Sequence, residues 1–161
     1  MLYNVSYRIV QNTHDAQDIV QDSLIKAFKN ISKLDEEAHL GGWLKRIAVN
    51  TSIDFVQKKK RQVWIDERFQ IEDKEEHDTE ASFVETLESV ELIKNCLNSL
   101  KDKYRIILNL YLIEDYNHRE ISELLHLKES TVRNQYRRGK NLLLQEIQKH
   151  SPDGLKRTHT E

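Results

Sequence analysis

Apolar residues recur every three or four positions in several separate stretches of this sequence, and this periodicity constrains the fold more than any other feature. Such spacing places side chains on one face of an α-helix, whereas a half-buried strand would need strict alternation. The chain has four glycines and one proline among 161 residues, so it lacks the turn residues that a many-stranded sheet requires. We therefore predict an all-α protein.

The first strongly periodic stretch predicts a helix from about residue 13 to 30, with Asn12 or Thr13 as its N-cap. Its apolar stripe, which we expect to face the core, consists of Ala16, Ile19, Val20, Leu24, Ala27, Phe28 and Ile31. Gly41 and Gly42 then let the backbone turn before a second helix over residues 43–59. The expected inward stripe of that helix is Leu44, Ile47, Ala48, Thr51 and Phe55.

In the second half, the same periodicity predicts two more helices, joined near residues 99–102. Their expected core residues are Phe83, Leu87, Val90, Ile93, Leu97, Tyr104, Ile107, Leu108, Tyr111 and Leu112. A sharper pair follows, with a tight break at residues 126–128. Its apolar positions are Ile121, Leu124 and Leu125 before the break and Val132, Tyr136, Leu142 and Leu143 after it. A short helix, a three-residue turn and a second helix are typical of a helix-turn-helix.

Charge is distributed unevenly along the chain, although the formal net charge is −2. Four consecutive cations occupy residues 58–61, residues 62–91 are strongly acidic, and residues 128–140 are basic again. The acidic stretch is poor in apolar residues, which is typical of a flexible linker. We expect two small helical domains over residues 1–64 and 82–149, an acidic linker over 65–81 and a flexible tail over 150–161.

The second helix of the helix-turn-helix has the composition of a DNA-reading surface. Arginine can bond guanine bidentately, asparagine can bond adenine, and further cations hold phosphates. Hydroxyls in the first turn of a helix also suit a phosphate. The predicted DNA-binding residues are Ser130, Thr131, Arg133, Asn134, Arg137, Arg138 and Lys140. The alternative is a basic, solvated helix face in an unrelated bundle.

A polar ridge lies on the helix predicted over residues 43–59. It consists of Asn50, Asp54, Lys58 and Arg61, which follow one another at spacings of four, four and three. Because the ridge ends in the cationic cluster, it can face nucleic acid and contact phosphate. The alternative is a solvated run of charges.

Three stretches of this chain resemble the extracytoplasmic-function (ECF) branch of the bacterial sigma-70 family. They are residues 15–22 (DAQDIVQD), residues 42–50 (GWLKRIAVN) and the helix-turn-helix from Glu120 to Arg133. They occur in the family's order, and the resemblance as a whole covers most of the chain. The resemblance implies a sigma factor that binds RNA polymerase core and directs promoter-specific transcription initiation.

The resemblance also implies roles for single residues. Asp18, Gln21 and Asp22 would face the clamp coiled coil of the polymerase β′ subunit, and the β flap would be a second contact. The ridge from Asn50 to Arg61 would bind the −10 element, with Asn50 and the loop before Trp43 holding a flipped base. The helix-turn-helix would read the −35 element of promoter DNA, and an anti-sigma factor is an implied partner. Trp43 as a core aromatic and Asn50 as a surface amide are the alternatives.

The chain departs from the family pattern in three places. It begins almost at the helix predicted over residues 13–30, which corresponds to the family's region 2.2, whereas relatives usually carry another helix or more before it. Either the start is truncated, therefore, or the first domain is incomplete. His126 stands where the turn usually has glycine, so it must tolerate a positive φ at a cost of about 1 kcal/mol, or the turn must differ. Lys128 stands where the family often has a serine cap.

The sequence offers no set of nucleophile, base and oxyanion donors, so we expect no catalytic residue, metal or cofactor. The seven histidines are scattered and are expected at the surface, and Cys96 has no cysteine to pair with. The uncharged run over residues 106–113 is far shorter than the roughly 20 residues that span a bilayer, and no secretion signal is evident. We expect a cytoplasmic protein without membrane insertion.

Two other classes of protein remain as alternatives. A helix-turn-helix transcription regulator that does not join RNA polymerase, such as the output half of a response regulator, would need a phosphoacceptor aspartate at a strand end. The helical pattern of residues 13–59 offers no such strand. A pure interaction protein would act through the acidic linker.

Overall fold

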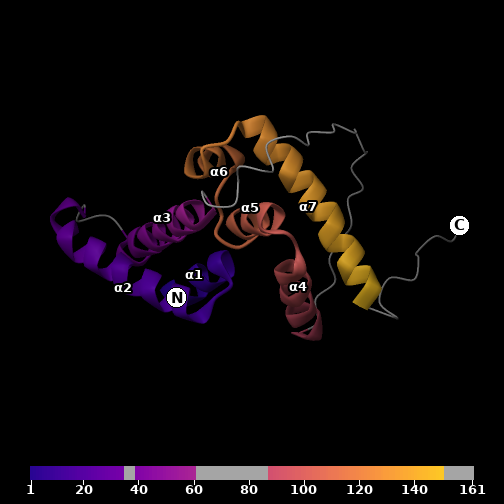
Figure 1. Cartoon of the computed structure of the whole chain (residues 1–161), viewed down its shortest axis with the longest axis horizontal. Helices are drawn as coiled ribbons and strands as arrows, with labels where there is room; N and C mark the ends of the chain where they lie inside the picture. The colour runs from indigo at the N-terminus through magenta and orange to yellow at the C-terminus, as the bar shows by residue number, and fades with distance from the viewer. Residues whose placement is uncertain (35–38, 61–86, 151–161) are drawn as a thin grey trace, which may run out of the picture.

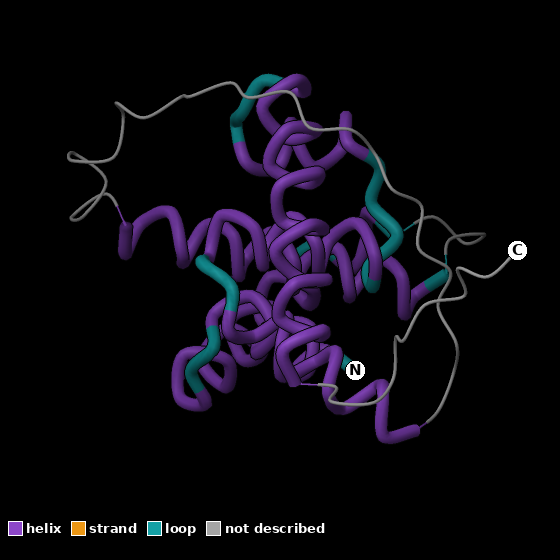
Figure 2. Tube along the Cα trace, turned by 90° about the vertical axis from the view of Figure 1, so that its right-hand side faces the viewer, coloured by secondary structure: helices purple, strands orange, loops and turns teal. Residues whose placement is uncertain are grey.

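The computed structural model describes residues 1–34, 39–60 and 87–150, and within each of these ranges the chain is mostly helical, with short loops where helices follow one another (Figure 2). In chain order, the elements are α1 (Leu2–Val10), α2 (Thr13–Lys29), the 3-10 helix η1 (Ile31–Lys33), α3 (Leu40–Lys60), α4 (Leu87–Ser99), α5 (Asp102–Leu112), α6 (His118–Leu125) and α7 (Glu129–His150). No strand occurs in these described ranges, and the predicted all-α fold is confirmed.

The helices α1, α2 and α3 pack against one another and form the first helical group (Figure 1). Ser23 and Ser52 are fully buried in this group. Each hydroxyl donates to a carbonyl four residues earlier in its own helix, at 2.6 Å for Ser23 and 2.7 Å for Ser52. These small polar side chains therefore need no further partner, and they sit in the interior without an unsatisfied hydroxyl.

The second helical group consists of α4, α5, α6 and α7, with α7 packed on each of the other three. Residues 105–110 of α5 are all buried, so this helix lies at the centre of the molecule (Figure 1). One apolar cluster joins α4, α5 and α7 through Cys96, Leu97, Leu100, Leu108 and Leu143.

A second apolar cluster is shared by the two groups. Its buried members are Val5, Ile9, Val49, Ile53, Ile106, Ile107, Leu110, Ile121 and Val132. They come from α1 and α3 on one side and from α5, α6 and α7 on the other. The two groups therefore bury apolar surface against each other as well as within themselves.

The structure adds a helix before the first predicted one and moves the beginning of the second predicted helix from residue 43 to Leu40. α1 was not anticipated: it buries Val5 and Ile9, four residues apart, and ends at Gln11 in the left-handed conformation with φ 53°. Gly41 and Gly42 do not form a turn, because they lie inside the first turn of α3. Of the two predicted N-caps of α2, Asn12 is the one observed, since its side chain accepts the Asp15 amide at 3.0 Å.

Several residues expected in the core are exposed instead. On α2 and η1, Leu24 is 38% exposed, Phe28 76% and Ile31 52%. In the second group, the same correction applies to Val90, Tyr111, Leu112 and Leu142. The predicted acidic linker and Phe83 lie outside the described residues. Within the described part, no helix combines the length and the apolar character needed to cross a membrane.

Candidate nucleic-acid interface

The helix-turn-helix is formed by α6, the turn at residues 126–128 and α7, as predicted. A capping box begins α6: the Asn117 side chain accepts the Glu120 amide at 3.0 Å, and Glu120 accepts the Asn117 amide at 2.8 Å. The turn begins at His126, whose φ of 54° is left-handed. The expectation that a non-glycine residue must tolerate a positive φ there is confirmed.

The exposed side of α7 carries the predicted DNA-binding residues. Ser130, Arg133 and Asn134 are exposed, while Thr131, Arg137, Arg138 and Lys140 are half-buried. Val132, Gly139 and Leu143 lie on the buried side and hold the helix on the core. Glu129 accepts hydrogen bonds from Arg133 Nε at 3.1 Å and Nη2 at 2.5 Å, so the guanidinium already has a defined position.

Gly139 sets how closely α7 approaches α5, and sequence reasoning missed its role. A Cβ at this position would lie 3.1 Å from Cβ of Tyr104 and 3.2 Å from Cδ1 of Leu108. Such distances are shorter than ordinary van der Waals contact, so a larger side chain would push the recognition helix outward. A glycine inside a helical pattern was the available signal.

An aromatic cluster packs the recognition helix α7 against α5 and α6. The rings of Tyr111, His118 and Tyr136, one from each of α5, α6 and α7, have centroids 4.5 to 5.1 Å apart. Burial lowers the pKa of His118, and the neighbouring Arg133 lowers it further, while Glu129 opposes the shift. The expectation that His118 lies at the surface is wrong, because it is half-buried in this cluster.

The polar ridge of α3 is present as predicted over its described part. Asn50, Asp54 and Lys58 are all exposed, and Arg61 lies outside the described residues. Arg46 is exposed one turn before Asn50, so it extends the ridge with another cation. Sequence reasoning missed Arg46, although the spacing of four residues from Asn50 was the signal that would have found it.

Asn50 lies between two cavities. One of about 320 Å³ lies between α2 and α3 and is lined by Trp43 and Asn50 with Lys26, Asn30, Lys33, Ile47 and Thr51. Trp43 is half-buried, so it forms part of a wall beside the Asn50 amide rather than a fully enclosed core residue. Cations and amides thus surround a space beside an aromatic ring.

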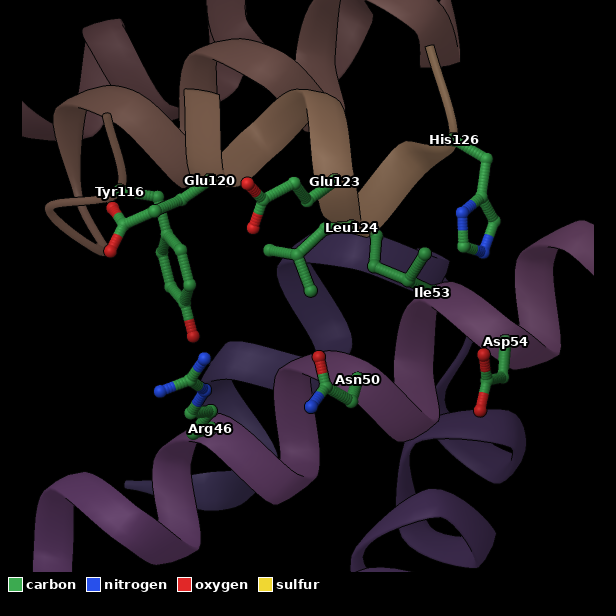
Figure 3. Close-up of a pocket in the computed structure, with 9 residues that line it drawn as sticks. All are labelled: Arg46, Asn50, Ile53, Asp54, Tyr116, Glu120, Glu123, Leu124 and His126. Carbon is green, nitrogen blue, oxygen red and sulfur yellow. The ribbon is translucent and has the colours of Figure 1, made fainter. Parts of the chain in front are cut away.

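The other cavity, of about 390 Å³, lies between α3 and α6. Figure 3 shows Arg46 and Asn50 on α3 facing Tyr116, Glu120 and Glu123 across it. The pKa of the Tyr116 hydroxyl is raised, chiefly by burial, and the nearby Arg46 offsets part of this shift. One wall of this cavity is therefore cationic and amide-bearing, and the other is acidic.

A third surface lies on α2, where Asp18, Gln21 and Asp22 are exposed as predicted. Ile25 and Phe28 are also exposed, at 51% and 76%, and continue this side of the helix by one turn or more. The surface is therefore acidic at one end and apolar at the other. In the part of the chain that the structure describes, no group of three histidine, cysteine, aspartate or glutamate side chains is placed to hold a metal ion.

Comparison with known proteins gives the same division of the chain into two parts. Residues 1–62 match the family model of Sigma-70 region 2, and residues 91–143 match that of Sigma-70, region 4. The chain is 31% identical to the ECF RNA polymerase sigma factor SigW of Bacillus subtilis, over 91% of this chain and 82% of that protein. It is 30% identical to the RNA polymerase sigma factor SigV of the same organism, over 88% and 81%.

The fold is also similar to that of a solved sigma factor. RpoE of Bartonella quintana, in its complex with the anti-sigma factor NepR, matches with a TM-score of 0.56 and 20% identity, over 91% of this chain and 89% of that one. With two family matches in the expected order and curated relatives along nearly the whole chain, this protein belongs to the ECF branch of the sigma-70 family of RNA polymerase sigma factors.

Proposed function

We propose that this sigma factor joins RNA polymerase core through α2 and reads promoter DNA with α3 and α7. The observation that carries the proposal is that one chain presents two separate helix faces equipped for DNA, the amide and cationic ridge of α3 and the basic side of α7. A regulator with a single helix-turn-helix has no use for the first of these faces. The non-polymerase alternative therefore explains less of the molecule.

At the −35 element, α7 is the reading helix. Arg133 and Asn134 are exposed near its N-terminal end, where a recognition helix meets base edges in the major groove. Ser130 and Thr131 stand in the first turn beside free backbone amides, which favours a phosphate contact. Arg137, Arg138 and Lys140 lie further along and suit phosphates at the edge of the groove.

At the −10 element, Asn50 is the base-contacting residue, and Asp54, Lys58 and Arg61 continue the contact along the strand. An amide beside the Trp43 ring, next to a cavity of about 320 Å³, has the equipment to hold an unstacked base. Lys26 and Lys33 line the same cavity and suit the phosphates that flank such a base.

The α2 surface is the proposed contact with the β′ clamp. Asp18 and Asp22 lie one turn apart and can pair with cations of a partner, while Ile25 and Phe28 supply apolar area next to them. The β flap is a further contact implied by the family. RpoE of Bartonella quintana binds the anti-sigma factor NepR, and we propose a partner of that kind for this chain.

The proposed activity is binding and positioning rather than catalysis, and it takes place where the chromosome and the polymerase are, in the cytoplasm. The test is transcription in vitro with purified core polymerase on a promoter library randomised at the −35 and −10 positions. We expect enrichment of one pair of elements when this chain is present. Transcription that remains unselective with the chain added would rule out the proposed function.

The polymerase surface has its own test. Asp18→Asn combined with Asp22→Asn should weaken binding to core polymerase, because two exposed carboxylates lose their charge. Asp115→Asn is the matched control: it also neutralises an exposed carboxylate, and asparagine tolerates the left-handed φ of 61° at that position. Equal binding by the double variant and the control would show that this side of α2 does not meet the polymerase.

A further inference from the structure

The joint between the two helical groups contains a buried charge. Glu114 follows α5, and its side chain is 4% exposed. Its carboxylate pairs with Arg8 of α1 and, at 3.2 Å, with Lys45 of α3. Lys45 also donates to the Glu114 backbone carbonyl at 3.2 Å. One residue of the second group thus holds two cations of the first.

Two further polar contacts cross the same joint. Arg105, buried in α5, donates to the carbonyl of Ile9 at the end of α1 at 3.1 Å. Gln11 donates to the side chain of Asn98 on α4 at 3.0 Å. Both contacts join the C-terminal end of α1 to the second group, where the last carbonyls of a helix lack partners within the helix. Together with the shared apolar cluster, they fix α1 and α3 against α5 and α6.

This closed arrangement places α6 opposite the ridge of α3. Arg46, Asn50 and Asp54 keep solvent exposure, but they line a cleft whose other wall is Tyr116, Glu120 and Glu123 (Figure 3). A nucleic-acid strand carries its phosphates along the ridge, where α6 obstructs it and Glu120 repels it, while Glu123 is paired with Arg119 at 3.3 Å. Lys45, which directly precedes Arg46 in α3, is already neutralised by Glu114.

We propose that Glu114 is the latch of an autoinhibited state, in which the helix-turn-helix packs over the α3 ridge and keeps the free chain from binding single-stranded DNA. The proposal rests on the proposed function only in naming α3 as a DNA-binding face. Opening separates α5 and α6 from α1 and α3, hydrates Glu114, and releases Arg8 and Lys45. Both cations then add to the positive charge beside the ridge.

The physical basis of the latch is a charge that is stable in the interior only while its partners are present. A buried carboxylate requires paired cations, and Glu114 has one from each of two helices of the other group. The side chains of Arg8 and Lys45 are 29% and 28% exposed, so water already reaches part of each. Losing the ion pair with Glu114 therefore costs these two cations little. Neutralising Glu114 therefore weakens the joint without leaving a charge buried.

The first measurement is the distance between the two groups by single-molecule energy transfer in the full-length chain. Dyes are placed at Thr13→Cys, two residues after Gln11, and at Lys94→Cys, one turn before Asn98, two exposed positions near a contact between the two groups, while the buried Cys96 thiol is slow to react. We expect one short distance for the parent chain and a second, longer distance for Glu114→Gln. Asp115→Asn, the exposed carboxylate next in the same loop, should keep the short distance.

The second measurement is binding of a fluorescent pool of random single-stranded 20-mers to the same free proteins. Apparent affinity is proportional to the fraction of molecules in the open state, so Glu114→Gln, which raises that fraction, should bind about tenfold more tightly than the parent chain. Asp115→Asn should match the parent. A short distance retained by Glu114→Gln would overturn the latch, and a longer distance with unchanged DNA affinity would overturn the autoinhibition.

A second variant, at the partner of Glu114 in the ion pair, shows whether the effects come from loss of the pair and not from misfolding of one variant. Arg8→Gln leaves Glu114 paired with Lys45, and it should give the same longer distance and tighter DNA binding, to a smaller extent. Thermal unfolding of each variant confirms that it is folded. Failure of the parent chain to bind core polymerase would contradict the proposed function but would leave the distance measurement, and hence the latch, unaffected.

Discussion

The recognition helix is tested most directly by separating its base-reading side chain from its phosphate-gripping ones. Arg133 lies in the second turn of α7 and is exposed, so Arg133→Ala should weaken binding to the preferred −35 duplex far more than to a mismatched duplex. Lys140, half-buried two turns further on, should act on phosphate alone. Lys140→Ala should therefore weaken binding to both duplexes equally.

The expected loss of DNA affinity for Arg133→Ala follows from two contacts of Arg133: the ion pair with Glu129 in the free chain and the contact with guanine in the complex. In the free chain it pairs with Glu129, but the two side chains are 66% and 39% exposed, and exposed pairs of this spacing contribute about 0.3–0.5 kcal/mol. A bidentate contact with guanine contributes about 1–3 kcal/mol of discrimination. The net loss on the matched duplex is thus dominated by the base contact, and corresponds to about 5- to 140-fold in Kd.

The assay is fluorescence anisotropy of the full-length chain on matched and mismatched −35 duplexes over a series of salt concentrations. Lys140→Ala should reduce the slope of log K against log salt by about one unit. Glu129→Gln, which removes the partner of Arg133 but keeps the arginine, should change the matched Kd less than Arg133→Ala does. Equal losses on both duplexes for Arg133→Ala would refute base reading by this residue.

Four other outcomes are expected. Asn117→Ala removes the capping box of α6 and should lower the free energy of unfolding by about 1 kcal/mol in a denaturant titration. Gly139→Val should cost about 1–3 kcal/mol in the same titration, because its side chain meets α5. The folded state lowers the pKa of His118, so stability should be lost as pH falls from about 6.5 through the folded pKa, and His118→Gln should reduce this loss in thermal melts across pH. Phe28→Ser should change the free energy of unfolding by less than about 0.5 kcal/mol, because Phe28 is 76% exposed, yet weaken core polymerase binding measured by competition.

Local patterns in the sequence predicted what depends on neighbouring residues. The spacing of apolar side chains predicted α2, α3, α4, α5, α6 and α7, and the break at residues 126–128 followed from the same pattern. The N-cap of α2 was narrowed to Asn12 or Thr13 because an N-cap side chain acts on amides within three or four residues. α1 was missed because nine residues give few repeats of the helical period, and most of its stabilising contacts are with other helices.

Periodicity does not reveal which apolar face is covered by the chain itself. Leu24 lies four residues after Val20 and three before Ala27, and Phe28 lies four residues after Leu24, which are spacings typical of core residues. Yet Leu24 and Phe28 are exposed while Ile19 and Ala27 are buried. The prediction placed too many residues of α2 in the buried stripe, because periodicity does not show how much of that stripe α3 covers. The role of Glu114 was equally inaccessible, since its partners lie 69 and 106 residues away.

The exposed Phe28 and the buried Glu114 follow from one property of the chain, which is that each helical group is small. A unit of about 60 residues buries too little of its own surface to be strongly stable alone. The shared cluster of Ile9, Ile53, Ile107 and Ile121 gives each group apolar contacts that the other supplies. If the chain opens on the polymerase, those contacts are lost, and the apolar surface around Phe28 is available to replace them. A variant that weakens the joint should therefore lower the stability of the free chain and ease its transfer to the polymerase, because the opening that docking requires is already made.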